Sequence, residues 1–137
     1  MRFYYHGRAV GSNRRLQPSR GRLVATTTYA KFKEALAVTF LSQKGADMIE
    51  KPQEVTLDVL IRCPSKADPT NYLKPIADAL EVAKVYDNDR QVVQVKLVES
   101  ISHTRPGLAT FVIAVGLGAG RTIGAEEALD AAEKNSP

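Results

Sequence analysis

Residues 68–93 read DPTNYLKPIADALEVAKVYDNDRQVV, and this stretch decides the fold of the 137-residue chain. Apolar residues recur in its middle at three- and four-residue spacing, which predicts one helix from about residue 73 to residue 84. Runs of alternating apolar residues precede and follow this helix, which is the pattern of a strand, helix, strand crossover. Asp68 stands in the loop before the helix, and Asp87 and Asp89 stand in the loop after it. We expect the two loops to meet at a common edge of one sheet, where carboxylate oxygens can share a Mg2+ ion.

The rest of the chain predicts a small α/β protein. A second helix is indicated by large apolar residues at helical spacing, which begin after a cap at Thr27 or Thr28, end at Gly45 and comprise Tyr29, Phe32, Leu36 and Phe40. Alternating apolar residues predict strands at 2–6, 55–61, 93–97 and 111–115, with the last two joined as an antiparallel hairpin. These elements predict a mixed sheet of about four or five strands flanked by two main helices.

Composition points to one domain that works in the cytoplasm. The chain has no apolar run long enough to span a membrane, and its first residues lack the apolar stretch of a secretory signal, so we expect no membrane partner. The single cysteine, Cys63, cannot form an internal disulfide, which suits a reducing compartment. We interpret Cys63 as a small apolar filler and not as a nucleophile.

Positive charge is concentrated at the start of the chain. The formal net charge is only +4, but the first 22 residues contain no acid and carry Arg2, Arg8, Arg14, Arg15, Arg20 and Arg22. Glycine, serine and proline interrupt this segment, so we expect residues 8–22 to form a basic loop, with a short strand at 23–25. Such a block indicates a polyanionic partner, and a solvated basic face is the alternative.

The end of the chain differs in character, so we expect a domain at 1–115 and a C-terminal segment at 116–137. The sequence GLGAG at 116–120 follows a predicted strand, but Arg121 stands where the third glycine of a dinucleotide-binding loop belongs. We therefore expect no nucleotide cofactor. Residues 125–134 favour a helix, and the sequence leaves open whether it is docked, binds a partner or frays.

Each acid near the predicted crossover also has an ordinary structural explanation. Asp68 before Pro69 is a common helix start, with the aspartate as N-cap. Asp78 lies four residues after Lys74, where a surface ion pair can form. Residues 87–89 are aspartate and asparagine in a loop, where such side chains bond their own backbone. The order of the set, an acid, an amide, a lysine and then an acidic loop, favours a functional site over these separate explanations.

This ordered set resembles the RusA-type family of crossover junction endodeoxyribonucleases, the Holliday junction resolvases. The residues that carry the likeness are Asp68, Thr70, Asn71, Lys74, Asp78, Leu80, Asn88, Asp89, Gln91 and Val92. Upstream, GRAVGSNRR at 7–15 and the helix that follows look like the opening of that family, so the resemblance covers about residues 3–115. The family pattern has acids at the positions of Thr70 and Asn88, so two negative charges are missing from the expected metal site.

The resemblance implies a homodimeric nuclease that depends on Mg2+, with Mn2+ as a substitute, and that nicks four-way DNA junctions symmetrically. It assigns catalysis to Asp68, Lys74 and Asp89, and metal binding to Asp68 and Asp89, with Asp87 in place of a lost acid. A metal held by carboxylates activates a water molecule and neutralises charge on the leaving oxygen, while a lysine stabilises the transition state. We expect the DNA to be bound by Asn13, Arg14, Arg15, Arg20, Arg22, Asn71 and Lys74.

Two other functions stay open at this point. A loss of cutting through the Thr70 change would leave a junction-binding protein with an architectural or regulatory role. A small basic RNA-binding domain is the third interpretation, and it predicts no preference for branched DNA over a linear duplex.

Overall fold

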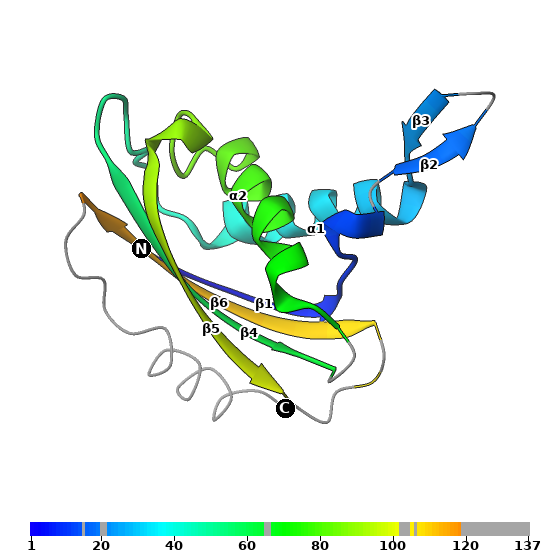
Figure 1. Cartoon of the computed structure of the whole chain (residues 1–137). Coiled ribbons are helices and arrows are strands. Elements are labelled where there is room, and N and C mark those ends of the chain that lie inside the picture. The colour runs from blue at the N-terminus through cyan, green and yellow to red at the C-terminus, as the bar shows by residue number, and fades with distance from the viewer. Residues whose placement is uncertain (15, 20–21, 65–66, 102–104, 106, 119–137) are drawn as a thin grey trace.

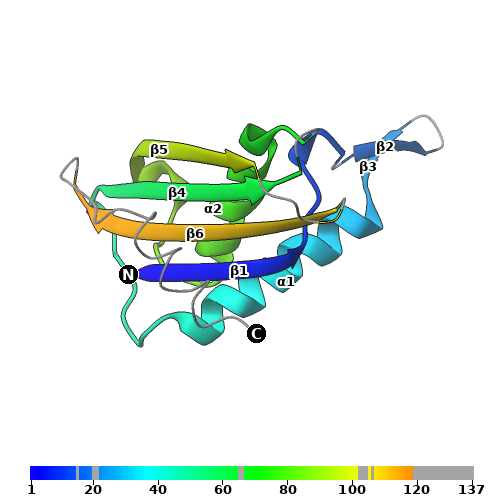
Figure 2. The ribbon, with the colours of Figure 1, turned by 90° about the horizontal axis from the view of Figure 1, so that it is seen from below.

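The protein consists of two layers, a four-stranded sheet and a pair of helices that covers one of its faces (Figures 1 and 2). The computed structural model describes residues 1–14, 16–19, 22–64, 67–101, 105 and 107–118. The sheet has the order β1-β6-β4-β5. Its strands are β1 (Arg2–Arg8), β4 (Val55–Cys63), β5 (Val92–Ile101) and β6 (Leu108–Leu117), and the helices are α1 (Thr27–Gln43) and α2 (Leu73–Val82). The expected α/β class, with a mixed sheet and two main helices, is confirmed.

β4 is the central strand, and its pairing sets the topology. It pairs with β6 in antiparallel fashion and with β5 in parallel fashion. β5 and β6 are therefore separated by β4, and the expected antiparallel hairpin between them is wrong. All but one of the β4 residues are buried. Burial along the whole strand is typical of a central strand that is hydrogen-bonded on both edges and packed on both faces.

A small hairpin stands apart from the main sheet. β2 (Leu16–Ser19) pairs with β3 (Arg22–Ala25), so the basic segment expected to be a loop contains two short strands, and the strand expected at 23–25 is part of the second. Figure 1 shows this hairpin projecting from the body of the protein near the start of α1. The segment that carries the arginines is thus held away from the core.

The helices form where the apolar periodicity predicts them. α1 buries Tyr29, Phe32, Leu36 and Phe40, but its N-cap is Thr26, one residue before the expected caps. α2 begins at Leu73, so Pro75 lies in its first turn, where a missing N–H removes no bond within the helix. Among the residues that the structure describes, no helix is long and apolar enough to cross a membrane.

An aromatic cluster joins the helix layer to the sheet. Phe111 on β6 is the centre of this cluster. The centroid of its ring lies 5.6 Å from the ring centroid of Tyr5, 6.2 Å from that of Phe32 and 5.3 Å from that of Tyr72. Tyr72 belongs to η2 (Pro69–Tyr72), the short helix between β4 and α2. The loop that carries Asp68 is therefore anchored in the core by the residue at the end of η2.

Candidate functional site

Asp68 caps η2, as the cap explanation predicts. Its Oδ1 accepts hydrogen bonds from the Thr70 backbone N–H at 3.0 Å and from the Thr70 hydroxyl at 2.7 Å, and Pro69 takes the first helical position. The side chain is nevertheless exposed, and both bonds go to one of its two oxygens. A cap of this kind holds the carboxylate in one orientation without removing it from solvent.

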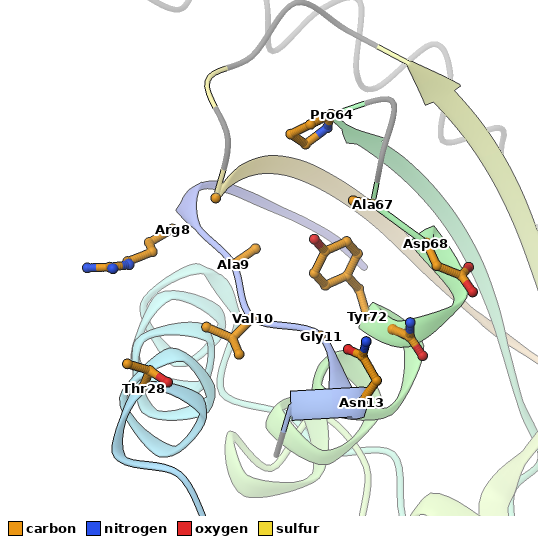
Figure 3. A pocket seen from close by; sticks show the side chains of 12 residues that line it. Arg8, Ala9, Val10, Gly11, Asn13, Thr28, Pro64, Ala67, Asp68 and Tyr72 are labelled. Carbon is orange, nitrogen blue, oxygen red and sulfur yellow. The ribbon is translucent and has the colours of Figure 1, made fainter. Parts of the chain in front are cut away.

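Asp68 also lines a pocket of about 540 Å³ at the junction of three segments (Figure 3). Asn71 of η2 and Asn13 of η1 (Ser12–Arg14) line the same pocket, and so does Arg8 at the end of β1. Figure 3 shows Arg8 and Asp68 on opposite sides of the hollow. The structure thus brings together three of the predicted site residues, Asp68, Asn71 and Asn13.

Gly11 allows η1 to approach η2 closely. A Cβ atom at this position would lie 2.7 Å from Asn13 Oδ1 and 3.0 Å from Asn71 Cβ, so a larger residue would require the Asn13 side chain to turn away and η2 to shift by a few tenths of an ångström. η1 leads directly into the β2–β3 hairpin, so this contact sets the hairpin beside the Asp68 pocket. Arg15 and Arg20, and the side chains of Arg14 and Arg22, lie outside the described residues, so their predicted contacts with DNA stay predictions.

The acidic loop after α2 is built around Gln91. Its Oε1 accepts from the backbone N–H groups of Asp87 at 2.9 Å and Asn88 at 2.8 Å, and its Nε2 donates to the carbonyls of Ile49 and Gln53. Asn88 Oδ1 accepts from the Arg90 N–H at 2.8 Å and so caps η3 (Asp89–Gln91). Asn88 therefore has a structural role here, and the loop holds Asp89 exposed at the start of η3.

The negative charges of three carboxylates act on the hydroxyl of Tyr86, which lies against α2. Tyr86 is fully buried and donates to the Ala77 carbonyl at 2.6 Å. Burial raises the pKa of its hydroxyl far above the ordinary value, and the negative charges of Asp89, Glu81 and Asp78 raise it further. Glu81 Oε1 also accepts from the Asp89 N–H at 3.1 Å, a contact that sequence reasoning missed. The spacing of Asp78 and Glu81 on one helix face was the available signal.

The remaining predicted residues have ion-pair partners. Lys74 Nζ lies 3.7 Å from Asp78 Oδ2, as predicted, and Lys33 Nζ of α1 lies 3.3 Å from the same oxygen. Asp87 lies 3.7 Å from Lys51. Lys74 and Asp87 are at least 40% exposed in these pairs, so each pair is worth no more than about 1 kcal/mol, and either residue can exchange its partner for a ligand at little cost.

Asp68 and Asp89 do not meet within one chain, so the expectation of a common edge is wrong. β4 and β5 are parallel, with Val55 opposite Val92 and Cys63 opposite Ile101. Asp68 follows the C-terminal end of β4, whereas Asp89 precedes the N-terminal end of β5, and the ten residues of α2 run back between them (Figure 1). Ten helical residues span about 15 Å, whereas two oxygens on one Mg2+ lie at most about 4 Å apart.

Each chain therefore carries two separate acidic positions, one at each end of α2. Among the described residues no group of three or more histidine, cysteine, aspartate or glutamate side chains is placed to hold a metal. The carboxylates of Asp68 and Asp89 suit Mg2+ chemically, because exposed carboxylate oxygens are the hard donors that it prefers. What one chain lacks is convergence of these donors at one point.

A comparison with protein families identifies the class. The family model described as Endodeoxyribonuclease RusA matches residues 7–112, which is more than half of the chain. The protein therefore belongs to the RusA family of endodeoxyribonucleases, which are junction-cleaving nucleases. No curated protein matches the chain.

Replacement of Tyr86 by phenylalanine tests the electrostatics of the α2 end. Because the folded protein holds the Tyr86 proton more tightly than the unfolded chain does, the wild-type free energy of unfolding is fully present below about pH 10 and falls as pH rises above it. Tyr86→Phe should lose about 1 kcal/mol at neutral pH with the hydrogen bond to Ala77. Above about pH 10, the free energy of unfolding of this variant, measured by urea denaturation, should fall less steeply with pH than that of the wild type. Tyr5, whose pKa burial also raises, accounts for part of the slope that remains. An unchanged slope in Tyr86→Phe would contradict this account.

Proposed function

We propose that this protein is a Mg2+-dependent Holliday junction resolvase that acts as a homodimer and whose two active sites are each shared between the subunits. The single observation that carries the proposal is the separation of Asp68 and Asp89 by the length of α2. A site that needs both acids has to take one of them from a second copy of the chain.

A two-fold symmetric dimer meets this need with one arrangement. If α2 of one subunit runs antiparallel to α2 of the other, Asp68 of the first lies near Asp89 of the partner subunit. The same axis then places the reciprocal pair together, so the dimer gains two sites at once. Two equivalent sites match the near two-fold symmetry of a four-way junction, which needs two nicks.

The outer surface of the helices supports a subunit contact. Val82 of α2 is 65% exposed, and Val38 and Leu41 of α1 are 62% and 56% exposed. These three residues line a groove of about 330 Å³ between the helices. A cluster of large exposed apolar side chains is typical of an interaction surface.

Each residue of the proposed shared site has its own role in cleavage. Asp68 and Asp89 of the partner subunit would hold Mg2+, or Mn2+ in its place, and the ion would supply an activated water and neutralise the leaving oxygen. Asp87, two residues before Asp89, adds negative charge at the same end of α2. Lys74, in the first turn of α2, stabilises charge on the phosphate by direct attraction. Asn71 and Asn13 orient the phosphate at the Asp68 pocket, while Arg14, Arg15, Arg20 and Arg22 bind phosphates farther along the arms.

Mixing of two inactive variants tests whether the sites are shared. Asp68→Asn and Asp89→Asn homodimers should each lose at least about a hundredfold in cleavage of a labelled synthetic junction with Mg2+. A heterodimer of the two has one site with both acids intact and one site with neither. The mixture should therefore regain single nicks, in one strand of each junction, and EDTA should abolish them.

If each site lay within one chain, both sites of that heterodimer would be defective and the mixture would stay inactive. Native mass spectrometry confirms that heterodimers are present, so an inactive mixture counts against shared sites. Asp47→Asn, a change at an exposed acid outside α2 and outside the two acidic positions, is the matched control and should cleave as the wild type does. A wild-type protein that binds junctions tightly but makes no nicks with Mg2+ or Mn2+ would overturn the catalytic proposal itself and favour the junction-binding alternative.

Thr70 gives that alternative its specific support. Its hydroxyl donates to Asp68 at the position where the family pattern has an acid, so the site carries one negative charge fewer. Thr70→Asp should restore this charge and lower the Mg2+ concentration for half-maximal cleavage by about tenfold. Thr70→Ser keeps the hydroxyl and should leave the Mg2+ dependence unchanged. An unaltered Mg2+ dependence in Thr70→Asp would mean that residue 70 lies outside the metal site.

A further inference from the structure

The face of the sheet that α1 and α2 leave uncovered, here called the outer face, carries its own apolar cluster. Figure 2 views the protein from this side, with the strands in front of the helices. The strand registers place Tyr4, Val112, Leu60 and Val98 in one row across the sheet, and these residues form a cluster separate from the main core.

The low exposure of the outer face points to a covering layer that the two helices do not supply. Leu60 and Val112 are only 3% and 2% exposed, and Thr56 and Asp58 on the same face are each 3% exposed. Neighbouring strands shield the sides of such residues but not their tips, and both described helices pack on the opposite face. Thr56 Oγ1 is buried and has no hydrogen-bond partner among the described residues.

The C-terminal segment is long enough to reach this face. The backbone N–H of Gly118 donates to the Glu54 carbonyl at 2.7 Å, which fixes the start of the segment at the end of the sheet where β4 begins. Val112 lies five positions before Leu117 on β6, about 17 Å along the strand. Residues 119–124 span about 20 Å when extended, so residue 125 can lie beside the outer cluster.

The sequence of this segment complements the outer face in apolar character and charge. Apolar residues recur at helical spacing and form one stripe: Ala125, Ala128, Leu129 and Ala132. Glu126 and Glu133 flank one side of that stripe. The outer face carries more positive than negative charge, because it holds Arg2, Arg62 and Lys96 against Asp58 alone.

We propose that residues 125–134 dock on the outer face of their own chain. The apolar stripe covers Leu60 and Val112, and the flanking glutamates lie toward Lys96 and the neighbouring arginines. The segment is then a cover for the sheet, and the basic β2–β3 hairpin on the far side of the molecule is left as the arm that meets DNA.

Carbodiimide coupling of the full chain tests the docking with native residues, because it joins a lysine to a carboxylate only in direct contact. We expect Lys96 to couple to Glu126 or Glu133. An equal mixture of 14N- and 15N-labelled protein, allowed to exchange subunits, should give only light–light and heavy–heavy coupled peptides. Mixed-mass peptides would show that the segment docks on a second copy, and coupling of these glutamates only elsewhere, or not at all, would also overturn the proposal.

Two variants of the segment separate its apolar stripe from its charge. Leu129→Asp should abolish the Lys96 coupling, whereas Ala131→Asp, which adds the same carboxylate outside the stripe, should retain it. Retention of the coupling in Leu129→Asp would overturn docking through the stripe. Since the readout is a covalent link and not cleavage, its failure leaves the nuclease proposal untouched.

Discussion

The parallel pairing of β5 with β4 is the interaction from which the other features of this protein follow. Parallel neighbours cannot be joined by a tight turn, so the chain has to cross back over the sheet, and α2 makes that crossing. A helix that returns the chain to the start of the sheet separates the loops before and after it by its own length. Asp68 and Asp89 are thereby held apart in one chain, and this separation is the basis of the proposed active site shared between two subunits.

Contacts around Asp68 fix its position relative to the core and to the basic β2–β3 hairpin. Tyr72 packs against Phe111, and this contact anchors η2, the short helix that Asp68 caps, to the sheet. Gly11 lets the opening segment lie against Asn71, which brings the base of the basic hairpin to the same pocket. The position of Asp68 is thus fixed relative to the β2–β3 hairpin, which carries the arginines. The acidic loop at the other end of α2 has an equally firm support in the four hydrogen bonds of Gln91.

Local patterns in the sequence were enough to predict most elements but not how they pair. The helical repeat of Tyr29, Phe32, Leu36 and Phe40 reflects burial of one helix face, which the sequence displays directly. The alternation in β4 predicted a strand, although the structure buries both of its faces. The pairing of β6 with β4 and β1 depends on contacts between distant residues, so a sequential hairpin of β5 and β6 looked equally good. The cap on Asp68 and the Lys74–Asp78 pair were predictable because they are local. The separation of Asp89 from Asp68 follows from the predicted crossover itself, because a helix between two parallel strands places the loops at its two ends at opposite ends of those strands.

The family match establishes a junction-cleaving nuclease, and the separation of Asp68 from Asp89 supports the proposal of a dimer with shared metal sites. Thr70 and Asn88 stand where the family pattern has acids, so in the proposed site the remaining acids would carry a larger share of metal binding. The most direct measurement is anomalous difference density from a crystal of the protein soaked in Mn2+. The account predicts a peak bound by Asp68 of one subunit and Asp89 of the partner subunit, with a symmetry-related second peak. A peak bound by Asp68 and Asp89 of the same subunit would contradict it.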